Sequence, residues 1–162
     1  MSLVHNIKTG DFIRVIANHL RMSPQLVSDD ENTPGLLAPS TPVNNPDGEQ
    51  SRANSIVPMS KVANERTSRP TPLIGIRSGQ MVKTGFNSYD VFIFIRCYTS
   101  LDKAFVENDE ILSLVNSLLD NAFLPIPSAA VAEMTLEQVS GEEYDEGFKL
   151  NYRESQFRLN IT

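Results

Sequence analysis

The spacing of apolar and polar residues predicts an amphipathic helix near the start of the chain. The apolar residues that recur at helical spacing are Phe12, Ile13, Val15, Ile16 and Leu20. Thr9 is a suitable N-cap, Asp11 lies where it favours the positive end of the helix dipole, and Pro24 ends the helix after Met22. We expect the apolar face of this helix to be part of the core.

Two later stretches have the pattern of strands. Residues 72–77 predict a short strand that Gly79 ends, and Phe86–Tyr98 predicts a long one. One face of the long strand carries Tyr89, Val91, Ile93, Ile95 and Cys97. Phe92 and Phe94 lie on the other face, so this strand is apolar on both sides and both sides need a cover. We expect helices on one side and a loop, a hairpin or a second subunit on the other.

A second, longer helix follows, with Ser100 as its cap and Pro125 and Pro127 beyond its end. Its apolar stripe consists of Phe105, Ile111, Leu112, Val115, Leu118, Leu119 and Ala122. Acidic residues gather in its first half, where they favour the positive end of the helix dipole. The pattern is typical of a helix with one face on the core.

The final segment alternates between apolar and polar residues on both sides of an acidic turn at 141–147. The apolar set moves from even positions to odd ones at Phe157, which predicts a bulge or bend near Glu154–Gln156. The element order is helix, loop, strand, strand, helix, strand, strand. We therefore predict one α+β domain over residues 1–162, a mostly antiparallel sheet with two helices packed on it.

Residues 23–72 have the pattern of neither helix nor strand and predict a long Pro-rich loop or arm within the domain. Eight of the ten prolines fall here, and no aromatic residue occurs between Phe12 and Phe86, so little apolar area is available to offset ordering. Two pieces, Gln25–Ser28 and Ser55–Val62, have the composition of short extended segments. A flexible linker and an arm that orders against a neighbouring subunit both remain open.

Charge is divided unevenly along the chain. The net charge is −6, but residues 1–85 carry nine basic and seven acidic groups, whereas residues 86–162 carry five and thirteen. The acids that cluster most densely are Glu142, Glu143, Asp145 and Glu146. An acidic second half argues against nucleic-acid binding, which needs a basic surface. The acidic run is either a solvated loop or a surface that repels passing DNA or docks a basic partner.

The sequence offers no anchor for catalysis, so we expect neither an enzyme nor a bound cofactor or metal. It has no phosphate-binding loop and no Gly-x-Ser-x-Gly elbow. Cys97 lies inside the predicted strand, and with only His5 and His19 beside it a zinc site is not expected. No apolar run is long enough to span a bilayer, and the first ten residues lack the apolar core of a secretory signal, so we expect no membrane contact.

The order of elements resembles the tail terminator, or tail completion, proteins of long-tailed bacteriophages, the lambda-like tail-end ring family. The similarity rests on the helix at residues 9–22, the strand Pro-Leu-Ile-Gly-Ile, the long strand Tyr-Asp-Val-Phe-Ile-Phe-Ile-Arg-Cys-Tyr, the helix after it, and the last strand Phe-Arg-Leu-Asn-Ile-Thr. It covers residues 9–22 and 73–162 and rests on element order rather than on one motif. Residues 23–72 depart from the family pattern, because they are longer and richer in proline.

The resemblance implies a structural virion protein, assembled in the host cytoplasm. Such a protein forms a homo-oligomeric, six-subunit ring at the head-proximal end of the tail tube, stops the polymerisation of the tube protein and joins the tail to the head-completion or connector protein. DNA passes through the ring without specific binding. Phe92 and Phe94 are then candidates for the subunit interface, and Glu142, Glu143, Asp145 and Glu146 for the channel lining. The alternatives are a head-completion or stopper protein of the same neck, and a non-viral interaction module that binds through its Pro-rich arm.

Overall fold

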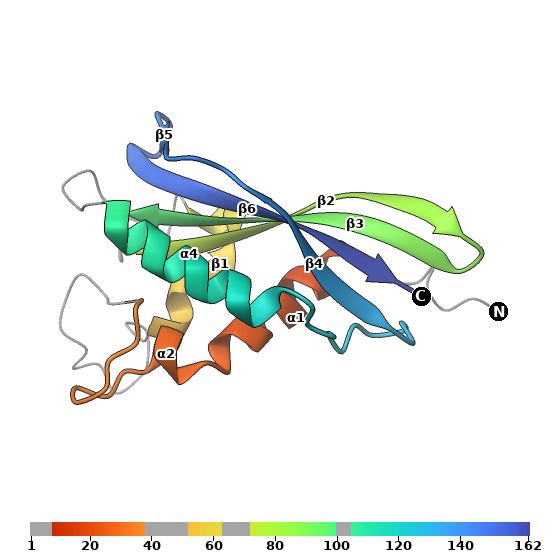
Figure 1. Ribbon diagram of the computed structural model, residues 1–162, viewed down its shortest axis with the longest axis horizontal. Helices are drawn as coiled ribbons and strands as arrows, with labels where there is room; N and C mark the ends of the chain where they lie inside the picture. Colours follow the sequence, from red (N-terminus) through yellow and green to blue (C-terminus); the bar gives the residue numbers. More distant parts are fainter. Residues whose placement is uncertain (1–7, 38–51, 63–71, 100–104) are drawn as a thin grey trace.

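A twisted sheet with helices on one of its faces forms the body of the protein (Figure 1). The computed structural model describes residues 8–37, 52–62, 72–99 and 105–162. The helical elements are α1 (Thr9–Arg21), α2 (Pro24–Val27), α4 (Phe105–Leu119) and the 3-10 turns η2 (Arg52–Ser55) and η3 (Met59–Lys61). The strands are β1 (Ile56–Pro58), β2 (Leu73–Gly85), β3 (Ser88–Thr99), β4 (Ala132–Val139), β5 (Glu143–Asp145) and β6 (Leu150–Ile161).

The strands lie in the order β1-β2-β3-β6-β4, and β5 also pairs with β6. Only the β1–β2 pair is parallel among these strands, and every other pair is antiparallel. The α+β prediction with a mostly antiparallel sheet is therefore confirmed. β2 and β3 form one hairpin and β5 and β6 another, and β6 lies between β3 and β4 in the sheet.

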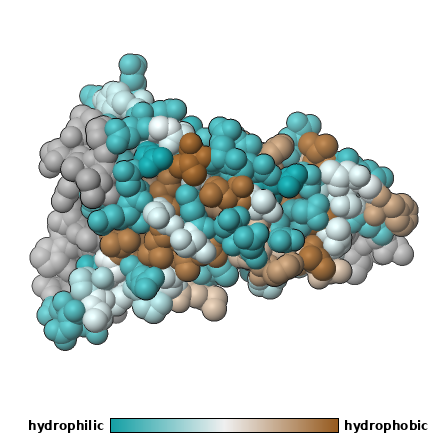
Figure 2. Space-filling view, viewed as in Figure 1, coloured by the Kyte–Doolittle hydropathy of each residue, from teal (hydrophilic) through white to brown (hydrophobic). Residues whose placement is uncertain are grey.

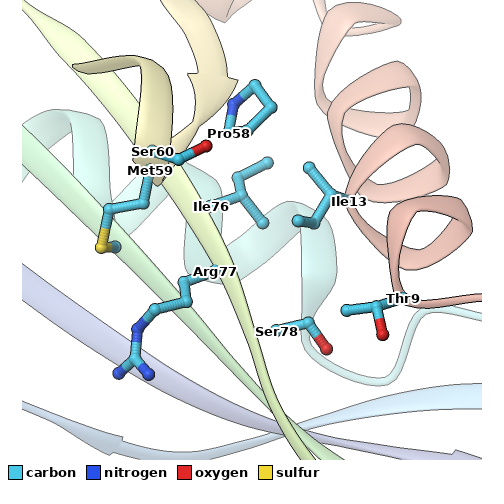
Figure 3. A pocket seen from close by; sticks show the side chains of 8 residues that line it. All are labelled: Thr9, Ile13, Pro58, Met59, Ser60, Ile76, Arg77 and Ser78. Carbon is cyan, nitrogen blue, oxygen red and sulfur yellow. The ribbon is translucent and has the colours of Figure 1, made fainter. Parts of the chain in front are cut away.

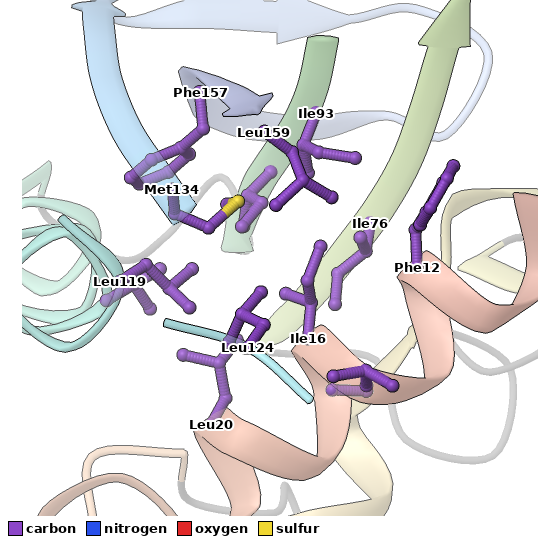
Figure 4. Close-up of a cluster of buried hydrophobic side chains, with 14 of the residues drawn as sticks. Phe12, Ile16, Leu20, Ile76, Ile93, Leu119, Leu124, Met134, Phe157 and Leu159 are labelled. Atoms are coloured by element: carbon purple, nitrogen blue, oxygen red, sulfur yellow. The ribbon is translucent and has the colours of Figure 1, made fainter. Parts of the chain in front are cut away.

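The core lies between the sheet and the two long helices. Side chains of α1 and α4 meet the odd-numbered residues of β3 and β6, as Figure 4 shows for Ile16, Leu20, Leu119, Phe157 and Leu159. The two helices also touch each other, because His19 Nε2 donates to the carbonyl of Leu118 at 2.9 Å. The predicted core faces of the long strand and of both helices are confirmed for the side chains that the structure describes, and the side chain of Phe105 lies outside them.

A second, smaller cluster lies on the opposite face of the sheet. It contains Val57, Val62, Leu73, Tyr98 and Leu150, with Phe148 and Tyr152 packed against it. This cluster explains the change from even to odd apolar positions in β6. Leu150 and Tyr152 pack in the small cluster, and the later odd-numbered residues Phe157, Leu159 and Ile161 pack in the main core. The bulge or bend predicted near Glu154–Gln156 does not interrupt the pairing of β6 with β3. The register shift lies in the neighbouring strand β4, between Leu136 and Gln138, opposite Phe157 and Gln156.

Two predicted boundaries need correction, and a third lies outside the described residues. Thr9 is the first residue of α1, and Lys8 is its N-cap without a side-chain hydrogen bond. Gly79 does not end β2, which continues to Gly85 with a register shift between Ser78 and Met81. A Cβ on Gly79 would lie 3.1 Å from the ring of Phe94, so glycine here lets that ring pack against the strand. α4 begins at Phe105 and ends at Leu119, and the proposed cap Ser100 lies outside the described residues.

The described parts of the predicted loop carry more structure than its composition suggests. Gln25–Ser28 is helical over most of its length, which contradicts the prediction of an extended piece, whereas Ser55–Val62 contains the strand β1. The reason is a small number of anchors: Leu26, Leu37, Ile56 and Val62 are fully buried. Arg21 at the end of α1 adds hydrogen bonds to the carbonyls of Ala53 at 3.0 Å and Ile56 at 2.7 Å. Residues 38–51 and 63–71 of this loop lie outside the described residues.

Candidate assembly surfaces

Cys97, the cysteine considered for chemistry, lies in the main core, whereas His5 lies outside the described residues. Cys97 is fully buried. Burial raises the pKa of the Cys97 thiol, and Glu107 raises it further, so a thiolate is disfavoured. Among the residues that the structure describes, no three His, Cys, Asp or Glu side chains gather as a metal site would need. The helices within those same ranges are all too short or too polar to cross a bilayer.

Phe92 and Phe94 lie on the sheet face opposite α1 and α4, and both are half-buried. The guanidinium of Arg77 sits 4.2 Å from the centre of the Phe94 ring, a cation–π contact. Across the sheet, Phe92 is paired with Arg158 and Phe94 with Gln156. Arg77 thus covers part of the Phe94 ring. Their assignment to a subunit interface stays a prediction.

The four acids of the predicted channel lining divide into two kinds. Glu143 accepts a hydrogen bond from the hydroxyl of Tyr152 at 2.5 Å. Asp145 accepts one from the backbone N–H of Phe148 at 3.0 Å and lies 3.7 Å from Arg96. These two acids therefore hold the turn against the sheet.

Glu142 and Glu146 are exposed and flank Tyr144, whose side chain is 47 % exposed. Glu143 is exposed as well, but its carboxylate accepts the hydrogen bond from Tyr152. The assignment of these acids to a channel lining stays a prediction.

Arg96 is the centre of a charged cluster on the same face. It donates to Glu154 at 2.6 Å, and its guanidinium lies 4.3 Å from the centre of the Tyr152 ring. Burial lowers the pKa of Arg96, but hydrogen bonds with Glu154 and Tyr98 outweigh this and raise it. The hydrogen bond to Glu143 raises the pKa of Tyr152 to about 12. Both groups keep their protons at neutral pH, which fits a structural cluster and not proton transfer. The cluster also joins the two predicted sites, because Arg96 is two residues from Phe94 and contacts Asp145.

The sequence interpretation missed an open sheet edge. β1 pairs with β2 only at Ile74–Ile76, and from Arg77 to Gly85 the outer side of β2 has no strand partner within the described ranges. Figure 1 shows the β2–β3 hairpin projecting beyond the helices. Its turn residue Phe86 is 91 % exposed, and Figure 2 shows apolar surface at this projecting end. Unpaired strand edges of this kind add strands from other chains. Gly85, which ends β2, and Asn87, a turn residue with a φ of 59°, are residue types that could have indicated this hairpin.

The other edge of the sheet is partly closed. The segment after α4 runs along β4: Leu124 N–H donates to the carbonyl of Ala132 at 2.8 Å, and Met134 N–H donates to that of Ala122 at 2.9 Å. Phe123, in this covering segment, is 67 % exposed. The two edges of the sheet therefore present different surfaces.

The two edges also differ in charge. The elements at the first edge, α1, β1, η3 and β2, contain five basic residues and one acid, a balance of +4. Residues 132–146 at the other edge contain six acids and no basic residue. Because β2 and β4 lie on opposite sides of the β3–β6 pair, these charges are well separated on one molecule.

A groove lies at the basic edge, where β1 stops beside β2. Its volume is 370 Å³, and Figure 3 shows Ile13 of α1 and Ile76 of β2 facing each other across it. The remaining lining residues are Thr9, Pro58, Met59, Ser60, Arg77 and Ser78. A second hollow of 240 Å³ shares Ile13 and Pro58 and extends along α1 to Arg14 and Arg21. No single sequence motif could reveal this groove, because three separate segments build it.

Comparison of the sequence with known protein-family models and with curated proteins finds no significant match.

Proposed function

We propose that the chain is a structural protein whose copies assemble head to tail into a closed ring, and that this ring is a phage tail terminator at the head-proximal end of the tail tube. The observation that carries the proposal is the pair of unlike sheet edges. One edge is basic and has an open strand and a groove, and the other is acidic and has a projecting turn.

Electrostatics favours contact between unlike edges. Two basic edges or two acidic edges brought together repel each other, whereas a basic edge and an acidic edge attract. Contact between two different surfaces of the same chain is heterologous, and it produces a closed ring when the rotation between subunits closes. A ring is the assembly that the resemblance to tail terminators implies.

An assembly protein needs complementary surfaces rather than a catalytic pocket. Half-buried Phe92 and Phe94, on the face opposite α1 and α4, offer apolar area that a neighbouring subunit or the tube protein would cover. The acidic second half of the chain disfavours DNA binding, which suits a ring through which DNA passes.

The test is native mass across a concentration series, with negative-stain imaging of the large species. Six 18.0 kDa subunits give a ring of about 108 kDa. The assembled protein is then mixed with purified tail tubes and with filled heads. Capping of tubes supports a terminator, and binding only to heads would instead indicate the stopper role. A chain that stays monomeric at every concentration and caps no tubes would contradict the proposal.

The alternative of an interaction module that binds through its Pro-rich arm is tested by replacing part of that arm. Removing residues 30–68 would delete Leu37, Ile56 and Val62, which are fully buried, and so would damage the fold. Replacing only residues 38–51 with a Gly-Ser linker of equal length leaves these anchors in place. Loss of partner binding with an intact ring would favour the arm as a ligand, and unchanged binding would favour the sheet edges.

A further inference from the structure

The groove at the basic edge has the properties of a receptor for an apolar side chain flanked by negative charge. Half-buried Ile13 is its accessible apolar wall, with fully buried Ile76 opposite, and half-buried Pro58 also lines it. The elements around it carry a balance of +4, of which Arg14 and Arg21 line the adjoining hollow, whereas Arg77 turns to Phe94 on the opposite face of the sheet. A central apolar anchor surrounded by complementary charges is the usual composition of a protein–protein contact.

The acidic turn of the same protein carries such an anchor. Side chains alternate along β5, so Tyr144 points away from the side on which Glu143 and Asp145 contact the sheet. Tyr144 is half-exposed and lies between the exposed acids Glu142 and Glu146. In Figure 1 β5 projects from the body of the molecule, which leaves the turn accessible to another protein.

The turn is already fixed in the single chain. The Asp145 carboxylate accepts a hydrogen bond from the backbone N–H of Phe148, and Lys149 N–H donates to the carbonyl of Asp145 at 2.7 Å. The bond between Tyr152 and Glu143 ties the other side of the turn to β6. A rigid turn loses little conformational freedom on docking, so more of the contact energy is available for binding.

A chain does not place this turn in its own groove. The groove lies beside β1 and β2 at one edge of the sheet, and β5 lies on β6 on the side of β4. The occupant is therefore a second copy. Each copy offers one groove and one turn, so the contact repeats head to tail.

We propose that Tyr144 of one copy inserts into the groove between α1 and β1–β2 of the next copy, with Glu142 and Glu146 facing its basic surroundings. This contact rests on the proposed ring and names the surfaces that join its subunits. It assigns the acidic turn to the subunit contact in place of the channel wall. Phe123 is more exposed than Tyr144, but its neighbours Ala122 and Leu124 carry no charge, so it lacks the complementarity of the turn.

Three single variants test the contact by sedimentation across a concentration series. Tyr144→Ala removes the anchor and Arg14→Glu reverses a charge beside the groove; Arg14 is 56 % exposed, so its replacement should leave the fold intact. We expect Tyr144→Ala and Arg14→Glu each to weaken self-association at least about 30-fold, the loss typical of an interface hot spot. Phe123→Ala is the matched control, an exposed aromatic on the same edge, and should assemble as the wild type does. Far-UV circular dichroism checks that all three variants fold.

Mixing the two defective variants gives the sharper result. The Arg14→Glu copy keeps a working turn and the Tyr144→Ala copy keeps a working groove, so one contact forms and growth stops there. A 1:1 heterodimer at twice the 18.0 kDa chain mass is expected, with no ring.

Several outcomes overturn the contact. Tyr144→Ala forming rings as readily as the wild type would refute it while leaving the ring itself intact. Equal weakening by Phe123→Ala, or full rings from the mixed variants, would also refute it. A wild type that is monomeric throughout and caps no tubes overturns both this contact and the proposed function.

Discussion

Gly35 lies so close to the backbone of α2 and Ser28 that no side chain fits at this position. A Cβ built there lies 2.5 Å from the carbonyl oxygen of Leu26, 2.6 Å from its carbonyl carbon and 2.7 Å from the backbone nitrogen of Ser28. All three are backbone atoms, so a side-chain rotation does not relieve the clash. Gly35→Ala must therefore move the segment that follows α2 away from the helix.

The expected loss of stability follows from what that segment holds. Local distortion of a packed site costs about 1–3 kcal/mol. Full undocking exposes Leu37, which is now fully buried, at about 2 kcal/mol. It also breaks the backbone bonds of Gly35, Leu36 and Leu37 to Ser28, Gln25 and Leu26, at about 1 kcal/mol each, with part recovered as chain entropy. We expect a net loss of about 2–3 kcal/mol.

Urea unfolding followed by far-UV circular dichroism measures this loss. For a chain of this length it corresponds to a fall in Tm of roughly 4–12 °C. Gly10→Ala is the control: a Cβ there meets nothing within 4 Å, and alanine should stabilise α1 by up to about 1 kcal/mol. Gly35→Ala as stable as the wild type, with Gly10→Ala behaving as expected, would refute the packing of residues 28–37 against α2.

Three further predictions concern the cluster around Tyr152 and the core. Because its pKa is raised to about 12, Tyr152 should contribute stability that is complete below pH 10, its ordinary pKa, and that declines as the pH rises towards 12. Glu143→Gln should lower that pKa and shrink the decline, as seen by absorbance titration at 295 nm; an unchanged titration would contradict the assigned hydrogen bond. The buried Cys97 thiol should resist a disulfide reagent in the folded protein and react fully in urea, whereas rapid reaction without denaturant would show that the core opens readily. Leu20→Ala should cost about 2–5 kcal/mol in urea unfolding, because the side chain is fully buried between helix and sheet, and a loss below 1 kcal/mol would show a looser core than Figure 4 indicates.

Part of the candidate surface could be predicted from the chain alone. The alternation around Phe92 and Phe94 placed both rings on the face away from the main core, and the clustering of acids singled out the turn at Glu142–Glu146. The different roles of those acids could not be predicted, because they depend on Tyr152, Phe148 and Arg96. Arg96 reaches the turn from another strand.

The sequence pattern also failed to predict where β2 ends. Glycine is a residue type that often ends a strand, and the register shift after Ser78 disrupts the period-2 alternation by which strands are recognised. Pairing with β3 continues the strand through the irregularity to Gly85. The composition of residues 23–72 likewise predicted a loop. Isolated apolar residues there, such as Leu26 and Ile56, are ordered because they pack into the main core.

The sequence by itself determined the faces of the long strand and of both long helices, because the period of apolar residues records which side of an element is buried. Only the tertiary structure decided which strands are neighbours, which edge stays open, and that the apolar shift in β6 reflects two clusters on opposite faces. The groove shows the physical reason. Ile13, Met59 and Ile76 have no periodic relation along the chain, and they meet because α1, η3 and β2 pack together in space.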